Sequence, residues 1–173
     1  MHEFALRALQ PASPPLPRFR AALAGAVLLG VTLALCAMVL GWVLEPLLRG
    51  RSVKLAGDAV FRSRDWFHIL FVALLWSPVF DTLVAQWLSI SFVRRFSRSM
   101  AAAVIAGAAV FSLWHMHSGG GWEQGIMTAI SGAVFSWRYV HGLDYGMPGA
   151  IALTAVVHAS NNALLLCALA LQG

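Results

Sequence analysis

Charged residues are scarce in this chain. Of its 173 residues, 11% are charged and 60% are hydrophobic. A soluble domain is about 25% charged and about 45–50% apolar, and a surface with so little charge would not stay dissolved in water. The composition therefore excludes an ordinary cytosolic enzyme and a disordered tail, and it predicts that the solvent is largely lipid.

Cysteine is also scarce, which excludes a small disulfide-linked scaffold. Cys36 and Cys167 both lie inside apolar runs and form no C-x-x-C motif, so they are interpreted as small core residues. The net charge of +5 does not indicate nucleic-acid binding, because the basic residues form short clusters between the apolar runs. Such clusters are typical of residues that anchor membrane topology. We expect a lipid bilayer as partner and no nucleic acid.

What the chain has in quantity is apolar runs. A helix needs about 20 apolar residues to cross a bilayer, and the chain contains about five runs of roughly that length. They cover residues 21–44, 66–93, 100–117, 125–140 and 148–171. The sequence therefore predicts an all-α integral membrane protein, a multi-pass bundle of about five transmembrane helices.

Three parts are distinguished along the chain. Residues 1–20 form an amphipathic and proline-rich N-terminal segment, residues 21–65 hold the first transmembrane helix and a basic loop, and residues 66–173 hold the other four runs. Pro78 in the middle of the long second run predicts tilt or a kink there. The small residues at 106–109 suit close helix packing.

A few polar residues lie deep inside the runs, where they are costly in lipid and indicate function. His158 and Asn162 are four residues apart, so they share one face of a helix. Helix geometry allows these side chains to meet in one buried polar pocket. The alternative is that they form interhelical hydrogen bonds that only hold the bundle together. The set consists of Asp81, His115, His158 and Asn162.

Two short motifs on separate runs form a recognisable pattern. The first runs from Phe111 to His115 as Phe-x-x-x-His, and the second runs from His158 to Asn162 as His-x-x-x-Asn. In order and spacing the chain resembles the CPBP family of intramembrane endopeptidases, also called the CAAX protease or Abi family. The resemblance implies that residues 66–173 are a four-helix catalytic core and that the first helix is an addition to it.

The family's remaining signature, Pro-x-x-Glu-Glu-x-x-x-Arg, is altered here. Pro78 is kept, Asp81 stands in place of the first glutamate, Thr82 in place of the second and Gln86 in place of the arginine. One acid and one base are lost together. The four-residue spacing of Thr82 and Gln86 predicts a neutral hydrogen-bonded pair in place of the ion pair.

The resemblance implies a mechanism without metal or cofactor. Asp81 would act as the general base on a water molecule, and His115 would help to position and polarise that water. His158 and Asn162 would donate hydrogen bonds to the developing oxyanion. The supporting residues would be Thr82, Gln86 and Phe111. The substrate would be a membrane-associated protein or peptide, and the location the cytoplasmic membrane of a prokaryote.

Several alternatives remain open at this stage. Asp81, His115 and His158 could bind a divalent metal ion as a set of two histidines and one carboxylate. Ser112 and Ser160 lie near the motifs, but local spacing places no base beside either, which disfavours a serine protease. A third alternative is a catalytically inactive membrane protein, either a binding or assembly factor or a small proton-relay protein.

Overall fold

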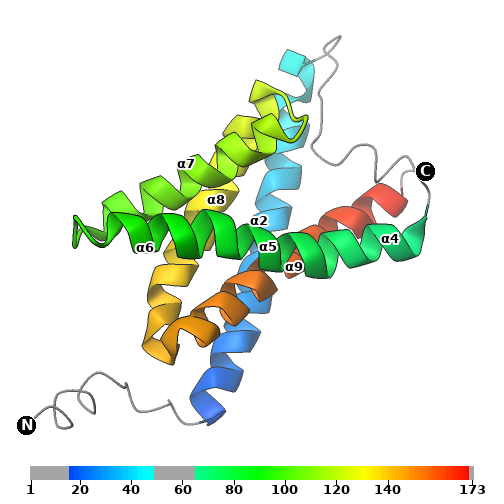
Figure 1. The fold of residues 1–173 in the computed structure, drawn as a ribbon. Coiled ribbons are helices and arrows are strands. Elements are labelled where there is room, and N and C mark those ends of the chain that lie inside the picture. Colours follow the sequence, from blue (N-terminus) through cyan, green and yellow to red (C-terminus); the bar gives the residue numbers. More distant parts are fainter. Residues whose placement is uncertain (1–15, 49–64, 172–173) are drawn as a thin grey trace, which may run out of the picture.

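The computed structural model describes residues 16–48 and 65–171, which are almost entirely helical (Figure 1). The predictions made for residues 1–15 and 49–64 therefore lie outside the described residues. The first helix, α2, already begins at Leu16, within the segment assigned to the N-terminal part. The bounds are as follows: α2 Leu16–Leu48, α4 Trp66–Phe71, η1 Val72–Trp76, α5 Ser77–Asp81, η2 Thr82–Leu88, α6 Ser89–Val93, α7 Met100–His117, α8 Trp122–Gly142, η3 Leu143–Tyr145 and α9 Gly146–Ala170.

Four segments of the described chain are long and apolar enough to cross a membrane. They are Arg18–Val43, Trp66–Val93, Met100–His117 and Trp122–Ala170. The last has 49 residues, more than twice the length that one crossing requires, and it is divided by the short turn of η3 into α8 and α9. The expected all-α membrane protein is confirmed.

The second and third apolar runs form helices with the predicted bounds because capping residues stand at their starts. Asp65 precedes α4, and its carboxylate accepts a hydrogen bond of 3.1 Å from the backbone N–H of His68. Ser99 precedes α7, and its hydroxyl oxygen accepts one of 3.2 Å from the N–H of Ala102. Such caps satisfy backbone donors that have no partner within the helix.

The helix from Trp66 to Val93, here called the carrier helix, changes its backbone register twice. η1 and η2 are π-helical and lie on either side of α5, which contains Pro78. The N–H of Ser77 donates to the carbonyl oxygen of Val72, five residues earlier. Short π-helical segments are frequent at functional sites. Beyond the tilt or kink predicted at Pro78, the structure therefore shows a wider helix on both sides of it.

The helices pack in pairs, with α7 along α8 and α2 along α9 (Figure 1). The carrier helix crosses this arrangement and contacts α7, α8 and α9. Small residues allow α7 and α8 to approach closely, as the sequence predicted. A Cβ atom on Gly132 would lie 2.9 Å from Cβ of Phe111 and 3.1 Å from Cα of Ala108. This contact places Phe111 directly against α8.

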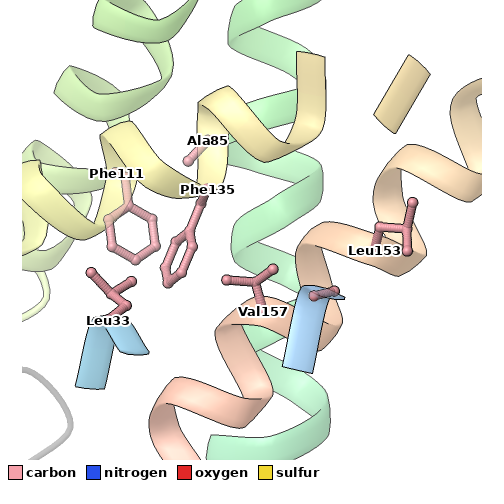
Figure 2. Close-up of a cluster of buried hydrophobic side chains, with 7 residues drawn as sticks. Leu33, Ala85, Phe111, Phe135, Leu153 and Val157 are labelled. Atoms are coloured by element: carbon pink, nitrogen blue, oxygen red, sulfur yellow. The ribbon is translucent and has the colours of Figure 1, made fainter. Parts of the chain in front are cut away.

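The largest buried apolar cluster contains residues from α2, the carrier helix and α7 to α9 (Figure 2). Phe111 and Phe135 meet within it edge to face, with ring centroids 5.4 Å apart. The buried members are Ala26, Leu33, Ala85, Phe111, Phe135, Leu153 and Val157. The candidate polar residues are held next to this cluster.

The arginines of the described residues gather at one end of the bundle. The rings of Phe19 and Tyr145 lie 5.7 Å apart, so the start of α2 is beside the start of α9. Ala103 and Tyr139 share a buried cluster with Ile90. The same end of the bundle therefore also holds the end of the carrier helix, the start of α7 and the end of α8. The arginines there are Arg18, Arg20, Arg94, Arg95, Arg98 and Arg138.

Candidate active site

Asp81 lies in the interior of the bundle, at the last residue of α5 and directly before η2. Its side chain is only 4% exposed. The hydroxyl of Ser77 donates a hydrogen bond of 2.6 Å to Oδ2 of Asp81. A buried carboxylate needs such a donor, and this bond leaves Oδ1 available to another partner.

His115 of α7 and His158 of α9 both contact the ring of Phe111. The ring centroids of His115 and Phe111 are 4.3 Å apart, and those of Phe111 and His158 are 5.6 Å apart. Nδ1 of His115 donates a hydrogen bond of 2.9 Å to the carbonyl oxygen of Phe111. Because a carbonyl can only accept, Nδ1 carries a proton in this bond, and Nε2 is the ring nitrogen left for another partner. Asp81, His115 and His158 thus lie on three different helices, and the Phe111 ring lies between the two histidines.

His158 is enclosed by aromatic rings. Its ring stacks on Phe135 at a centroid distance of 4.6 Å and an interplanar angle of 26°. Phe111 meets the His158 ring edge to face at 5.6 Å. The side chain is 4% exposed, and no hydrogen bond joins its ring to another described residue. Packing alone therefore sets the direction in which this imidazole points.

Asn162 connects α9 to the carrier helix. Its Nδ2 donates a hydrogen bond of 2.9 Å to the carbonyl oxygen of Ala73, in η1. Its Oδ1 accepts one of 3.2 Å from Nδ2 of the neighbouring Asn161. This residue thus makes the interhelical hydrogen bond that the sequence left open as an alternative, and one of its two amide N–H bonds is used for it.

The predicted hydrogen bond between Thr82 and Gln86 is wrong. The hydroxyl of Thr82 donates instead to the carbonyl oxygen of Pro78 at 2.6 Å, within its own helix. Both amide atoms of Gln86 are buried and have no hydrogen-bond partner among the described residues. A hydroxyl on a helix can bond the carbonyl four residues earlier, and here that nearer acceptor is used in place of the glutamine.

The structure adds residues that the motifs did not reveal. Ser77 holds the Asp81 carboxylate, and Phe135 stacks on His158. Asn161 is 6% exposed, and its Oδ1 has no hydrogen-bond partner within residues 16–48 and 65–171. The four-residue spacing of Ser77 and Asp81 was a signal that could have been read. Phe135 carried no such signal, because its contact with His158 is made between two helices.

The other chemistries considered from the sequence find no support in this geometry. In the part of the chain that the structure describes, no three or more His, Cys, Asp or Glu residues are grouped so that they could hold a metal ion. The hydroxyl of Ser112 donates to the carbonyl oxygen of Gly125 at 2.6 Å, and no histidine activates it.

Comparison with known proteins gives a family for most of the chain. Residues 63–164 match the model of the Rce1-like family, described as type II CAAX prenyl endopeptidase Rce1-like. This range includes Asp81, His115, His158 and Asn162, whereas α2 lies outside it. Searches of the curated proteins and of the solved structures found no match.

The family match covers more than half of the chain and agrees with the membrane-spanning helices. The chain therefore belongs to the Rce1-like family and is an integral membrane protease of the CPBP type, whose substrates are membrane-associated proteins.

Proposed function

We propose that this protein hydrolyses a peptide bond within a membrane-associated protein or peptide, and that Asp81 activates the attacking water. The observation that carries the proposal is the buried Asp81 carboxylate, with one oxygen held by Ser77, together with the contact of the Phe111 ring with both His115 and His158. Ser77 occupies Oδ2 of Asp81, and Oδ1 is the atom assigned to the water.

The reaction is an addition followed by an elimination. Oδ1 of Asp81 takes a proton from the water as its oxygen attacks the scissile carbonyl carbon, which gives a tetrahedral oxyanion. The C–N bond then breaks, and the proton held by Asp81 passes to the leaving amine. A carboxylic acid and an amine are released, and the Asp81 carboxylate is regenerated. General base catalysis of this kind contributes about 10²–10⁴ in rate.

The histidines are assigned different tasks because their surroundings differ. Nε2 of His115 accepts a hydrogen bond from the water, since Nδ1 of this ring is committed to Phe111. His158 donates to the oxyanion, and the remaining N–H of Asn162 is assigned as a second donor. One oxyanion donor contributes about 10²–10³ in rate.

The substitution of aspartate for glutamate moves the site closer to the helix. Asp81 is one methylene shorter, so the water must lie nearer to the backbone of α5. The wider turns of η1 and η2 flank this position, and we propose that they make room for substrate and water beside it.

The test is cleavage by the purified protein in liposomes, with a fluorogenic peptide that ends in a prenylated CAAX sequence. Asp81→Asn, His115→Ala and His158→Ala should each lower kcat by about 100-fold or more. Asp144→Asn and His117→Ala are matched controls because both side chains are exposed, and they should cleave at the wild-type rate. Full activity of Asp81→Asn, or wild-type protein that binds the peptide without cutting it, would contradict the proposal and favour a binding factor.

A further inference from the structure

The first helix, α2, lies outside the residues that match the family, yet one of its faces is buried. Ala26 and Ala34 are fully buried and Leu33 is 8% exposed, whereas Leu28 and Leu35 on other faces are 67% and 50% exposed. A helix that only anchored the chain in lipid would have no need of such a face. The buried face packs against α9, which carries His158.

At Gly30 the backbones of α2 and α9 are in close contact. A Cβ atom on it would lie 2.3 Å from the carbonyl oxygen of Val157, 2.7 Å from Cβ of Ser160 and 3.1 Å from the backbone nitrogen of Asn161. Real Cβ atoms essentially never come within 3.0 Å of a neighbour, so no larger residue fits without moving a backbone. The contacted atoms stand on both sides of His158 in the sequence.

Leu33 extends from this crossing toward the rings around His158. It belongs to the same buried cluster as Phe111, Phe135 and Val157. In Figure 2 its side chain points toward the two phenyl rings. These are the rings that stack on and abut His158. Because no hydrogen bond to a described residue fixes the His158 ring, whatever holds Phe111 and Phe135 also determines where that ring lies.

We propose that α2 contributes to the active site and that its Leu33 is a positioning residue for His158. Leu33 closes the apolar side of the aromatic enclosure, and Gly30 permits α2 to come near enough for it to do so. The inference rests on the proposed function, since it takes the direction of the His158 ring to matter for catalysis. Small displacements of catalytic groups are costly, and about 1 Å can reduce a rate about 100-fold.

The first experiment separates positioning from stability. Leu33→Ala should lower kcat about tenfold with KM within about twofold of wild type, and Leu33→Met should restore most of the rate. Leu35→Ala removes a side chain of the same type from an exposed face of α2 and should have no effect on kcat. If Leu33→Ala changed only the melting temperature, with kcat per folded molecule unchanged, Leu33 would be a packing residue and the inference would be wrong.

The second experiment uses the glycines of α2. Gly30→Leu should lower kcat at least as much as Leu33→Ala, whereas Gly25→Leu and Gly41→Leu should be active, because a Cβ atom at either position meets nothing within 4 Å. Equal rates for all three variants would show that the crossing does not affect the site.

A third readout does not depend on activity. In protein labelled at histidine, the ring protons of His158, assigned with His158→Gln, should be shifted by the ring current of Phe135. Leu33→Ala should move them, while those of the exposed His68 stay in place. Movement of the signal without a change in kcat would show that Leu33 positions the ring, and it would contradict the catalytic role proposed for His158. An unmoved signal would contradict the role of Leu33.

Discussion

Asn162 of α9 donates its hydrogen bond to the carbonyl oxygen of Ala73, 89 residues earlier in the chain. The π-helical register explains why this carbonyl is available. Ser77 donates to Val72, so the next donor in the same register, five residues after Ala73, would be Pro78. Proline has no backbone N–H. Asn162 therefore satisfies a carbonyl that the carrier helix cannot satisfy by itself.

This relationship predicts a coupling between residues 78 and 162. Asn162→Ala should reduce the free energy of unfolding by about 1–2 kcal/mol, because the Ala73 carbonyl is left without a partner. In a Pro78→Ala background the cost should be smaller, since the introduced alanine supplies a backbone N–H. Unfolding of the four proteins in mixed detergent micelles gives the double-mutant cycle. An equal loss of unfolding free energy in both backgrounds would show that Pro78 is not the reason why the Ala73 carbonyl needs Asn162 as a donor.

A second prediction concerns the altered signature. Gln86 is 1% exposed and Thr82 is fully buried, so Gln86→Arg or Thr82→Glu alone introduces a buried charge without a partner. Each should cost about 3–5 kcal/mol. The double variant restores the family's pair of opposite charges and should recover most of that loss. Thermal unfolding in detergent measures this, and a double variant as unstable as the two losses added together would refute the pairing.

A third prediction concerns Ser77, which holds Asp81. Ser77→Ala should lower kcat about tenfold with little change in KM, because a hydrogen bond to a charged group is worth about 1.5–3 kcal/mol. Ser89 is a suitable control on the same carrier helix, since its hydroxyl donates to the carbonyl oxygen of Ala85 in its own helix. Ser89→Ala should cleave at the wild-type rate. If both variants lost the same activity, the effect of Ser77 would be on the helix and not on the carboxylate.

The sequence predicted the elements well where composition changes sharply. The runs at 66–93 and 100–117 became helices with those bounds because Asp65 and Ser99 cap their starts. It also selected isolated polar residues of the apolar runs, and the structure buries two of them, Asp81 and His158.

What could not be read from the sequence depends on hydrogen-bond register and on contacts between helices. Hydropathy carries no information on whether a turn closes four or five residues apart, so η1 and η2 were not predicted. The prediction of a Thr82–Gln86 hydrogen bond was wrong because residue spacing indicates only that two side chains are near each other. The Thr82 hydroxyl has a nearer acceptor, the carbonyl oxygen of Pro78. The partner of Asn162 and the stacking of Phe135 on His158 required the assembled bundle.

The position of His115 has a consequence for water supply. Of the three ionisable groups it alone is partly exposed, and it stands two residues before the end of α7, at the end of the bundle opposite the arginines. Every peptide bond cut consumes one water molecule, which must reach a carboxylate surrounded by lipid and protein. His115 is thus the member of the candidate site nearest to the turn at Ser118, and we expect water to reach the site past this side chain.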